Sequence, residues 1–500
     1  MQDATRAERC LAILVRRTGA DWLLELWPVL LSIARLTWRF RRGPISPTSL
    51  FEFETALNDL LRELGRRLVQ WAVNRLEPEE RWKMPGQFLW DGEYYRRGHL
   101  SPLRNLHCLF GPIRLRRFCY QPLETSGRCL FPLELQLGIV AGVATPALAD
   151  FVARAAADLT QRQLLDQLHG RHVAWGVRTV RKVVEALAET MAVPRQEMQV
   201  RQVWQWLRQA AETAGPRRFT LSVGRDGIML PMVKSDKYKE ACTATLSVLD
   251  RCGRRLGTVY LGQMPEAGQA TLSTELSALI VAVLTHWEGP LPRLTYVTDC
   301  GHHPTDYFVR VLQTMRNPHR PAELLEWEWI VDYYHACQYI TKLAEALFGP
   351  GRSAFLWAAK QRRVLKEKPG GIFRVLRSAG ALLSVRGLVG SEDSYWLAYR
   401  YLRDRAAKMD YQTYRRRRLP IGSGVTEAAC KILFTQRFKQ SGMKWTIDGG
   451  SVILRLRVIA LSGIWAQVRT AALQSHRMPT PVAPMRSDIR AAQNCLKNAA

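Results

Sequence analysis

Apolar residues recur along the chain with two different periods, and the change of period divides it into regions. From Leu50 to Leu76 they return every three or four residues with Glu and Arg between them, which predicts one amphipathic helix of about seven turns. Shorter runs follow between Pro85 and Pro132. Among them, Ile113 to Phe118 alternates apolar and Arg positions, which is typical of a half-exposed strand in a small β-containing module. Helical periodicity returns from Leu133 to Val193.

The first 48 residues are apolar and rich in Arg, and they end in the turn-forming stretch Gly43 to Pro47. Trp22 to Leu36 is apolar but is interrupted by Glu25, Pro28 and Arg35, so it is too short and too broken to span a bilayer. We therefore expect a basic helical arm and no membrane partner.

Two predicted helices, Leu159 to Leu168 and Val177 to Leu187, are arranged like a helix-turn-helix motif. Arg178, Arg181 and Lys182 would project from the second helix, where such motifs meet the major groove of DNA. An ordinary helical hairpin with a solvated basic face stays an equal alternative, because the turn between the helices is long for the motif.

After Gly215 the chain alternates between strands and helices. The predicted elements are strands at 219–223, 242–249 and 256–261, a helix at 269–287, a strand at 294–298, a helix at 304–315, a strand at 327–331 and a helix at 333–348. Three strands in a meander followed by parallel strands with crossover helices form the ribonuclease-H-like pattern. The fold class is therefore predicted as α/β, with a ribonuclease-H-like core, an all-helical insertion and a mainly helical, DNA-binding N-terminal region.

Acidic residues stand at matching places in this pattern. Asp226 follows the apolar part of the first strand, and Asp299 follows the fourth, its expected neighbour in the sheet. Glu427 comes after the Gly-rich turn Pro420 to Gly424, in the first turn of a predicted helix. Close carboxylates repel each other unless a hard cation neutralises them, which indicates a site for Mg²⁺ or Mn²⁺. Taken singly, each acid could instead be a turn former or a helix-start residue.

These motifs give the chain a resemblance to the DDE transposases of bacterial insertion sequences. Asp226, Asp299 and Glu427 resemble their acidic triad, and Asp332-Tyr333-Tyr334-His335 is similar to the Asp-x-x-His element of Mutator-like and hAT-like transposases. The run Arg437 to Trp445 is similar to the C-terminal segment of the ISKra type. The resemblance covers about residues 50 to 470.

The resemblance implies an enzyme that cuts and joins DNA strands at the ends of a mobile element by two-metal-ion phosphoryl transfer. The triad would hold two Mg²⁺ or Mn²⁺ ions, with Asp332 and His335 in a structural or supporting role. His302 and His303 could contact a phosphate or only begin a helix. The partners implied are the terminal inverted repeats, target DNA and further copies of the chain, in a homodimer or larger oligomer on DNA.

Glu427 follows Asp299 by 128 positions, which is more than the fold needs, and a basic helical insertion at 349–419 accounts for the excess. In related transposases such a domain supplies an aromatic ring near the cleavage site. Here Trp396 is the candidate for stacking on a base, with a place in the helical core as its alternative. The cationic side chains expected to contact DNA, besides those of the helix-turn-helix, are Arg415, Arg416, Arg437, Lys439 and Lys444.

Charge and cysteine content agree with this picture. Lys and Arg number 72 against 44 Asp and Glu, a net charge of +28 spread along the chain, and this favours a nucleic acid as partner. The ten Cys residues form no Cys-x-x-Cys pair, as in reduced proteins of the cytoplasm, where a bacterial protein of this kind would be associated with the nucleoid. Buried thiols are expected at Cys108, Cys119 and Cys129, with a zinc site as the alternative.

The predicted division of the chain has seven parts. They are a basic helical arm at 1–48, a helix with a small β module at 49–132, a helical domain at 133–215, the two parts of the core at 216–348 and 420–470, the insertion at 349–419, and a C-terminal tail at 471–500. Two rival functions stay open. One is a catalytically silent DNA-binding protein, and the other is a ribonuclease-H-like nuclease that hydrolyses without joining strands.

Overall fold

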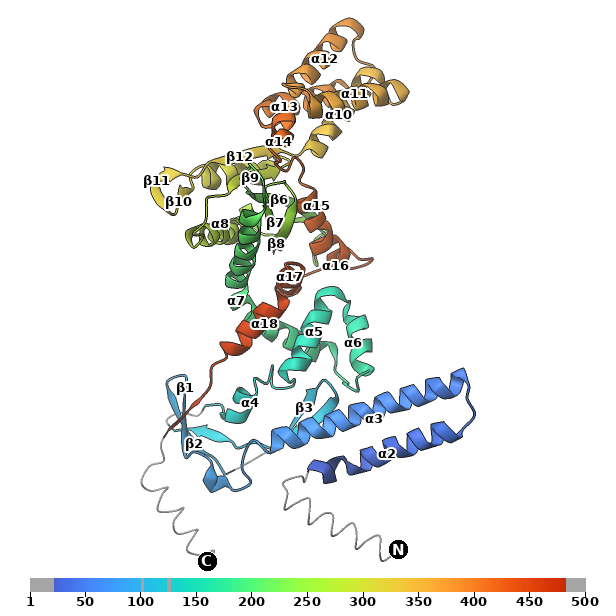
Figure 1. Cartoon of the computed structure of the whole chain (residues 1–500), viewed down its shortest axis with the longest axis vertical. Helices are drawn as coiled ribbons and strands as arrows, with labels where there is room; N and C mark the ends of the chain where they lie inside the picture. Colours follow the sequence, from blue (N-terminus) through green and yellow to red (C-terminus); the bar gives the residue numbers. More distant parts are fainter. Residues whose placement is uncertain (1–21, 100–102, 124–126, 483–500) are drawn as a thin grey trace, which may run out of the picture. The chain divides into compact units, whose positions relative to one another are not determined.

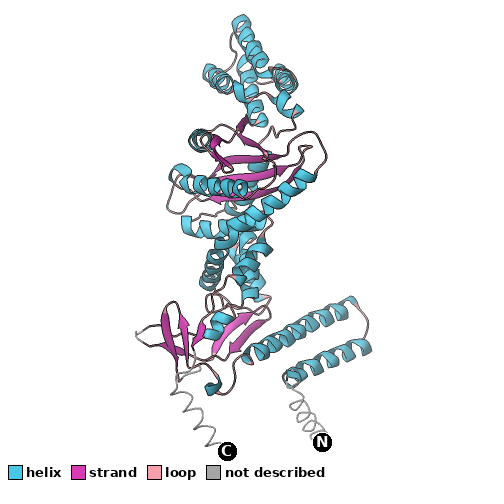
Figure 2. Cartoon of the chain, turned by 60° about the vertical axis from the view of Figure 1, so that its left-hand side comes forward, coloured by secondary structure: helices cyan, strands magenta, loops and turns pink. Residues whose placement is uncertain are grey.

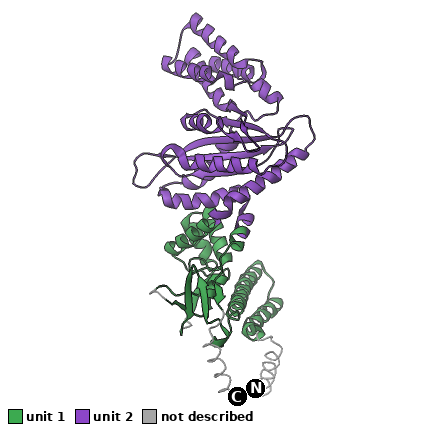
Figure 3. Ribbon diagram, turned by 90° about the vertical axis from the view of Figure 1, so that its left-hand side faces the viewer, with its two compact units in different colours: residues 1–190, 471–500 green, residues 191–470 purple. Residues whose placement is uncertain are grey.

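The computed structural model describes residues 22–99, 103–123 and 127–482 of the chain. The chain forms two compact units, which Figure 3 colours separately. Unit 1 contains residues 1–190 and 471–500, and unit 2 contains residues 191–470. Both mix helices with strands, in agreement with the predicted α/β class.

An antiparallel helical pair opens unit 1 (Figure 1). Helix α2 (Trp22–Arg42) is followed by the expected turn at Gly43 and then by α3 (Pro47–Asn74). Ser46 caps α3 through reciprocal hydrogen bonds with Ser49, so this helix begins three residues earlier than the apolar pattern indicated. The rings of Phe40 and Phe53 stack 4.3 Å apart and join the two helices. The first 21 residues of the predicted basic arm lie outside the described residues.

The β module expected between residues 85 and 132 consists of short antiparallel strands. They are β1 (Gln87–Trp90), β2 (Glu93–Arg97), β3 (Arg104–Cys108), β4 (Gly111–Leu115) and β5 (Tyr120–Pro122), with a 3₁₀ turn at Arg81–Lys83. In β4, Ile113 and Leu115 are buried and Arg114 is exposed, as the alternation predicted. A strand of the C-terminal segment, β13 (Thr480–Val482), pairs with β1, so the sheet order is β13-β1-β2-β5. Residues 471–482 are therefore part of unit 1 and not a free tail.

The helical region that follows contains α4 (Pro132–Gln136), α5 (Pro146–Asp158), α6 (Gln161–His169) and α7 (Val177–Glu212). Helices α6 and α7 match the two helices of the proposed helix-turn-helix, but α7 continues for 36 residues, far beyond Leu187. Arg178, Arg181 and Lys182 are exposed on α7, opposite the buried Val180 and Val183. Their exposure is compatible with either reading of the motif.

A five-stranded mixed sheet forms the centre of unit 2. Its strands are β6 (Thr220–Leu230), β7 (Lys239–Leu249), β8 (Arg255–Gln263), β9 (Arg293–Thr298) and β12 (Trp327–Val331). The order is β12-β9-β6-β7-β8, with β6, β7 and β8 antiparallel and β9 parallel to both β6 and β12. The predicted three-stranded meander and the predicted pairing of the first strand with the fourth are thus confirmed. The first strand is longer than expected, because it continues through Asp226 to Leu230.

Helices cover the sheet, as Figure 2 shows. Helix α8 (Ala270–Thr285) follows a 3₁₀ turn at Ala267–Gln269 and buries one apolar face in the core of the unit. Among the described residues, Ala267–Thr285 is one helix long and apolar enough to cross a membrane, and α17 with α18 would pass the same test as a bent pair. The buried face of α8 is that of an ordinary core helix.

Between β9 and β12 lie α9 (His302–Tyr307), a π-helical turn (Phe308–Leu312) and the hairpin of β10 (Arg316–Asn317) and β11 (Arg320–Leu324). The hairpin was not predicted. Helix α10 (Tyr333–Phe348) follows β12 with the bounds predicted from sequence.

The predicted insertion is helical throughout the described part of the chain. It consists of α11 (Arg352–Glu367), α12 (Gly371–Arg386), α13 (Glu392–Asp404), a 3₁₀ turn (Ala406–Lys408) and α14 (Tyr411–Arg416), grouped near the β12 edge of the sheet in Figure 1. The chain then continues through α15 (Gly424–Cys430), a π-helical turn (Lys431–Thr435), α16 (Gln436–Phe438), α17 (Ile447–Leu461) and α18 (Trp465–Gln474). Helix α15 contacts β6 and β7.

Candidate active site

The three predicted acids come from three elements that meet in unit 2. Strands β6 and β9 are paired in parallel up to Gly224 and Val297. Asp226 and Asp299 each stand two residues beyond this pair: Asp226 is still within β6, where it pairs with Thr243 of β7, and Asp299 directly follows β9. Glu427 lies in the first turn of α15, which packs against the same strand. The parallel register places the first two acids together, and α15 adds the third.

A glycine and two threonines bring α15 close to the sheet. A Cβ atom on Gly224 would lie 2.0 Å from the hydroxyl oxygen of Thr426, so any larger residue would push α15 away from β6. The hydroxyls of Thr426 and Thr245 on β7 are hydrogen-bonded at 2.9 Å in a buried position. Glu427 is adjacent to Thr426 in the chain, so this close contact sets its position.

The Asp226 carboxylate is partly buried and held by two donors. One oxygen accepts the backbone N–H of Gly227 at 2.8 Å, and the other accepts the thiol of Cys430 on α15 at 3.4 Å. Burial is the main cause that raises the pKa of Asp226 to about 6, and the negative charges of Asp299 and Glu427 contribute less in the same direction.

Asp332 is fully buried and connects β12 with the loop that leads to Glu427. One of its oxygens accepts the backbone N–H of His335 at 2.8 Å and caps α10, and the other accepts the N–H of Ser423. The hydroxyl of Ser423 in turn donates to the Glu427 carboxylate at 3.2 Å. Asp332 thus reaches the triad through one residue, which agrees with a supporting role.

The imidazole of His335 lies edge-on against the rings of Tyr339 and Tyr401, with centroids 5.4 and 5.8 Å away. His302 and His303 begin α9, and the His303 ring lies 3.8 Å from a carboxylate oxygen of Glu240. The two neighbouring histidines are thus surface residues of the helix start.

The donors of the acid cluster are of the type that Mg²⁺ and Mn²⁺ prefer, since all three are carboxylates. Within the residues that the structure describes, no group of three or more His, Cys, Asp and Glu side chains is arranged as it stands to hold a metal ion. The chemistry of the donors fits a hard cation, but their arrangement in this structure does not form a metal site.

Among the described residues, the cysteines of unit 1 likewise form no group that could hold a metal ion. Cys108 and Cys119 are buried, as expected of structural thiols, but Cys129 is exposed, so the expectation of a buried thiol is wrong at that position. Burial, with a smaller contribution from the neighbouring thiol of Cys129, raises the pKa of Cys119 to about 11.

The cations expected to contact DNA differ in exposure. Arg415, Arg416, Lys439 and Lys444 are exposed. Arg437 is buried instead, with its guanidinium 5.0 Å from the centre of the Trp445 ring. Its position inside the α15–α17 region favours a structural role over contact with DNA.

Trp396 is partly exposed on α13. Its indole N–H donates to Glu392 at 3.2 Å, and its ring stands edge-on to Tyr395 and Tyr399. The Trp396 side chain thus packs against the insertion on one side and is exposed on the other.

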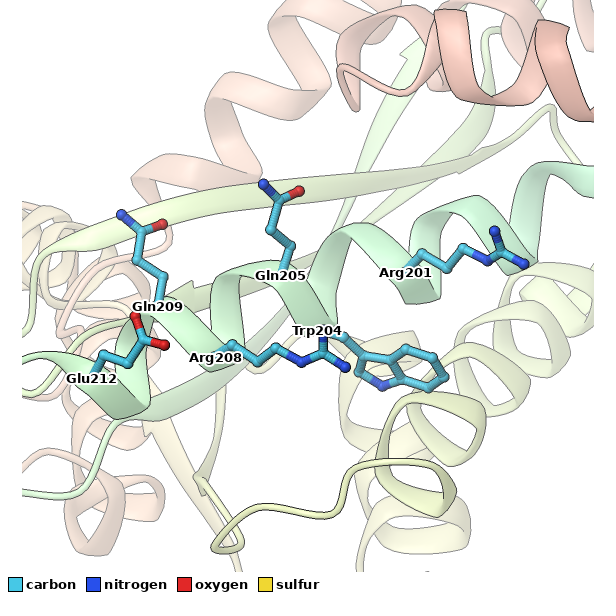
Figure 4. A pocket seen from close by; sticks show the side chains of 6 residues that line it. All are labelled: Arg201, Trp204, Gln205, Arg208, Gln209 and Glu212. Carbon is cyan, nitrogen blue, oxygen red and sulfur yellow. The ribbon is translucent and has the colours of Figure 1, made fainter.

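Sequence reasoning missed a hollow along α7 in unit 2 (Figure 4). Its lining comes from one face of the helix, namely Arg201, Trp204, Gln205, Arg208, Gln209 and Glu212. The spacing of three and four residues was present in the sequence, but nothing marked it as more than a solvated helix face. None of the three acids lines this hollow. It offers cationic, amide and aromatic groups that suit a nucleic acid surface.

In comparisons with known proteins, the chain matches no family model and no curated protein.

Proposed function

We propose that the chain is a metal-dependent DNA transposase of the DDE type, which cuts and joins the ends of an insertion sequence. The observation that carries the proposal is that the paired strands β6 and β9 and the adjoining helix α15 bring Asp226, Asp299 and Glu427 to one part of unit 2. Three carboxylates on two neighbouring parallel strands and a nearby helix are costly unless a cation joins them.

The strand order supports the finer fold assignment. A three-stranded meander with two parallel strands added beside its first strand is the arrangement we associate with a ribonuclease-H-like core. The helical segment between β12 and α15 agrees with the insertion implied by the resemblance to ISKra-type transposases.

In this proposal Asp226, Asp299 and Glu427 would hold two Mg²⁺ or Mn²⁺ ions. The ions would activate a water or a DNA 3′-hydroxyl and stabilise the leaving oxygen. Asp226 would give up its hydrogen bond from Cys430 when that oxygen acts as a ligand. Asp332 and Ser423 would keep Glu427 in place.

DNA binding would rest on the exposed cations of both units and on the net charge of +28. The hollow with Arg201 and Arg208 is a further candidate contact. We propose that the protein works in the bacterial cytoplasm, at the nucleoid, as a homodimer or larger oligomer on DNA. No part of the proposal involves a membrane.

The test uses the full-length protein and DNA duplexes that carry the sequences flanking its coding region. With Mg²⁺ or Mn²⁺ we expect cleavage and joining, and with EDTA neither. Asp299→Asn and Glu427→Gln should abolish cleavage and leave DNA binding nearly intact, because phosphate contacts come from Arg and Lys. The matched control is Glu323→Gln on the exposed β10–β11 hairpin, which should cut like the wild type.

The rival functions give different results in the same assay. A nuclease would hydrolyse DNA but give no joined product with either a free or a dideoxy-blocked 3′ end. A silent DNA-binding protein would bind without cutting. Binding that changes little between roughly 50 and 200 mM salt would argue against DNA as the partner altogether, since phosphate contacts release counterions.

A further inference from the structure

The turn that carries Asp299 is held from a distant part of unit 2. The backbone carbonyl of Asp299 accepts the hydroxyl of Tyr401 at 2.6 Å. The next carbonyl, that of Cys300, accepts the guanidinium of Arg405 at 3.2 Å. Tyr401 lies on α13 of the helical insertion and Arg405 ends that helix. Two consecutive carbonyls of the turn are therefore bound by side chains more than 100 residues further along the chain.

The two side chains are themselves fixed. The Tyr401 ring stacks on Tyr339 of α10, with centroids 3.7 Å apart and planes 9° from parallel. The guanidinium of Arg405 lies 4.3 Å from the centre of the same Tyr401 ring. Burial raises the pKa of Tyr401 well above its ordinary value, so its hydroxyl stays protonated and can donate at any working pH.

The turn needs such support. Cys300 has φ of 58°, in the left-handed region that residues with a side chain rarely adopt. Within the turn, the N–H of Gly301 donates to the Asp299 carboxylate at 2.9 Å and the N–H of Cys300 donates to Thr298 at 3.2 Å. The direction of the carboxylate therefore depends on the backbone that Tyr401 and Arg405 hold.

The neighbouring strand shows the same arrangement. The hydroxyl of Tyr411 on α14 donates to the carbonyl of Val331 at 3.0 Å, directly before Asp332. The parallel strands β9 and β12 lead to Asp299 and Asp332. At the end of each strand, a backbone carbonyl thus accepts a tyrosine hydroxyl from the insertion.

We infer that Tyr401 and Arg405 are positioning residues: from the helical insertion they hold the turn that carries Asp299 and so fix the direction of its carboxylate. The inference rests on the proposed function. It also makes the insertion a part of the active site: any movement of α13, for example when DNA binds to the insertion, would move Asp299.

The experiment compares two variants of the full-length protein that each lose one tyrosine hydroxyl from α13. Tyr401→Phe removes the bond to Asp299 and keeps the ring. Tyr395→Phe is the matched control, because Tyr395 is fully buried on the same helix and, among the described residues, its hydroxyl has no hydrogen-bond partner. Arg405→Gln tests the second contact.

Two measurements are made on each protein. Hydrogen exchange should become faster in Tyr401→Phe at the amides of Cys300 and Gly301 and stay unchanged along β7, with no change in Tyr395→Phe. Mn²⁺ affinity, measured from the free ion by electron paramagnetic resonance, should fall about tenfold in Tyr401→Phe and Arg405→Gln, as for other residues that orient ligands.

The outcomes separate the two proposals. Equal exchange and equal Mn²⁺ affinity in Tyr401→Phe and Tyr395→Phe would overturn the positioning role. Faster exchange throughout the sheet would also overturn it, because Tyr401 would then only support the fold. If the wild-type protein binds no Mn²⁺, the proposed function fails. A local change in exchange would then show that Tyr401 only stabilises the turn.

Discussion

Replacing Asp226 with Asn should make unit 2 more stable at neutral pH while abolishing the proposed activity. The pKa of Asp226 is about 6 in the folded chain against 3.8 for an ordinary Asp, chiefly because of burial. The folded protein therefore holds this proton more tightly than the unfolded chain. The contribution of this proton to stability is fully present below about pH 4 and is lost as the pH rises through 6.

The loss follows from the two pKa values. A folded-state pKa of about 6 against 3.8 corresponds to about 3 kcal/mol of stability lost when Asp226 ionises. Asn does not ionise, and its side-chain oxygen can still accept the N–H of Gly227. The stability of Asp226→Asn relative to wild type should thus rise by about 3 kcal/mol between pH 4 and pH 7.5, whatever the difference at pH 4.

Urea unfolding in EDTA, followed by tryptophan fluorescence at the two pH values, measures this difference. The other carboxylates are the same in both proteins and cancel in the comparison. Adding Mg²⁺ at ten times its dissociation constant should stabilise only the wild type, by about 1.4 kcal/mol. A difference between the two proteins that stays constant from pH 4 to 7.5 would refute the reasoning, because Asp226 would then have an ordinary pKa.

Three further predictions concern single contacts. Gly224→Ala should destabilise unit 2 by about 1–3 kcal/mol in urea unfolding, because the new Cβ meets the Thr426 hydroxyl, and Thr426→Ala should restore part of the loss. Burial raises the pKa of Glu77 to about 7. Ionisation of Glu77 should therefore cost unit 1 about 3 kcal/mol of stability between pH 5 and 8 in the wild type, and this loss should be absent in Glu77→Gln. Thermal melting across this pH range measures the difference. Trp396→Ala should lose second-strand cleavage at unchanged stability if the indole stacks on a base, whereas Trp396→Phe should keep it; a parallel loss of stability and activity would place Trp396 in the core.

The sequence was sufficient where local signals and burial agreed. Helix α10 has the predicted bounds because Asp332 caps it and Gly349, with φ of 70°, ends it. Strands β6 and β9 were predicted because their apolar runs are largely buried, and the predicted strand order placed Asp226 beside Asp299.

What could not be predicted depends on contacts between distant residues. The thiol of Cys430 bonds Asp226 across 204 positions of sequence, and Tyr401 bonds Asp299 across 102. Neither residue stands in a motif that marks it. Arg437 was expected on the surface because Arg usually is, yet here it is covered by Trp445 and its surroundings. Strand β13 is three residues long and contains Pro481, so it gave no periodic signal.

The pairing of β13 with β1 has a consequence for how the protein is made. The two strands are neighbours in the sheet of unit 1, but all of unit 2 is synthesised between them. At 5–20 residues per second, the roughly 280 residues of unit 2 take about 15 to 60 s to emerge from the ribosome. During that time β1 has an open edge. A chain released before Thr480 lacks β13 and never closes this edge of the sheet, so the sheet is complete only in chains translated nearly to the end.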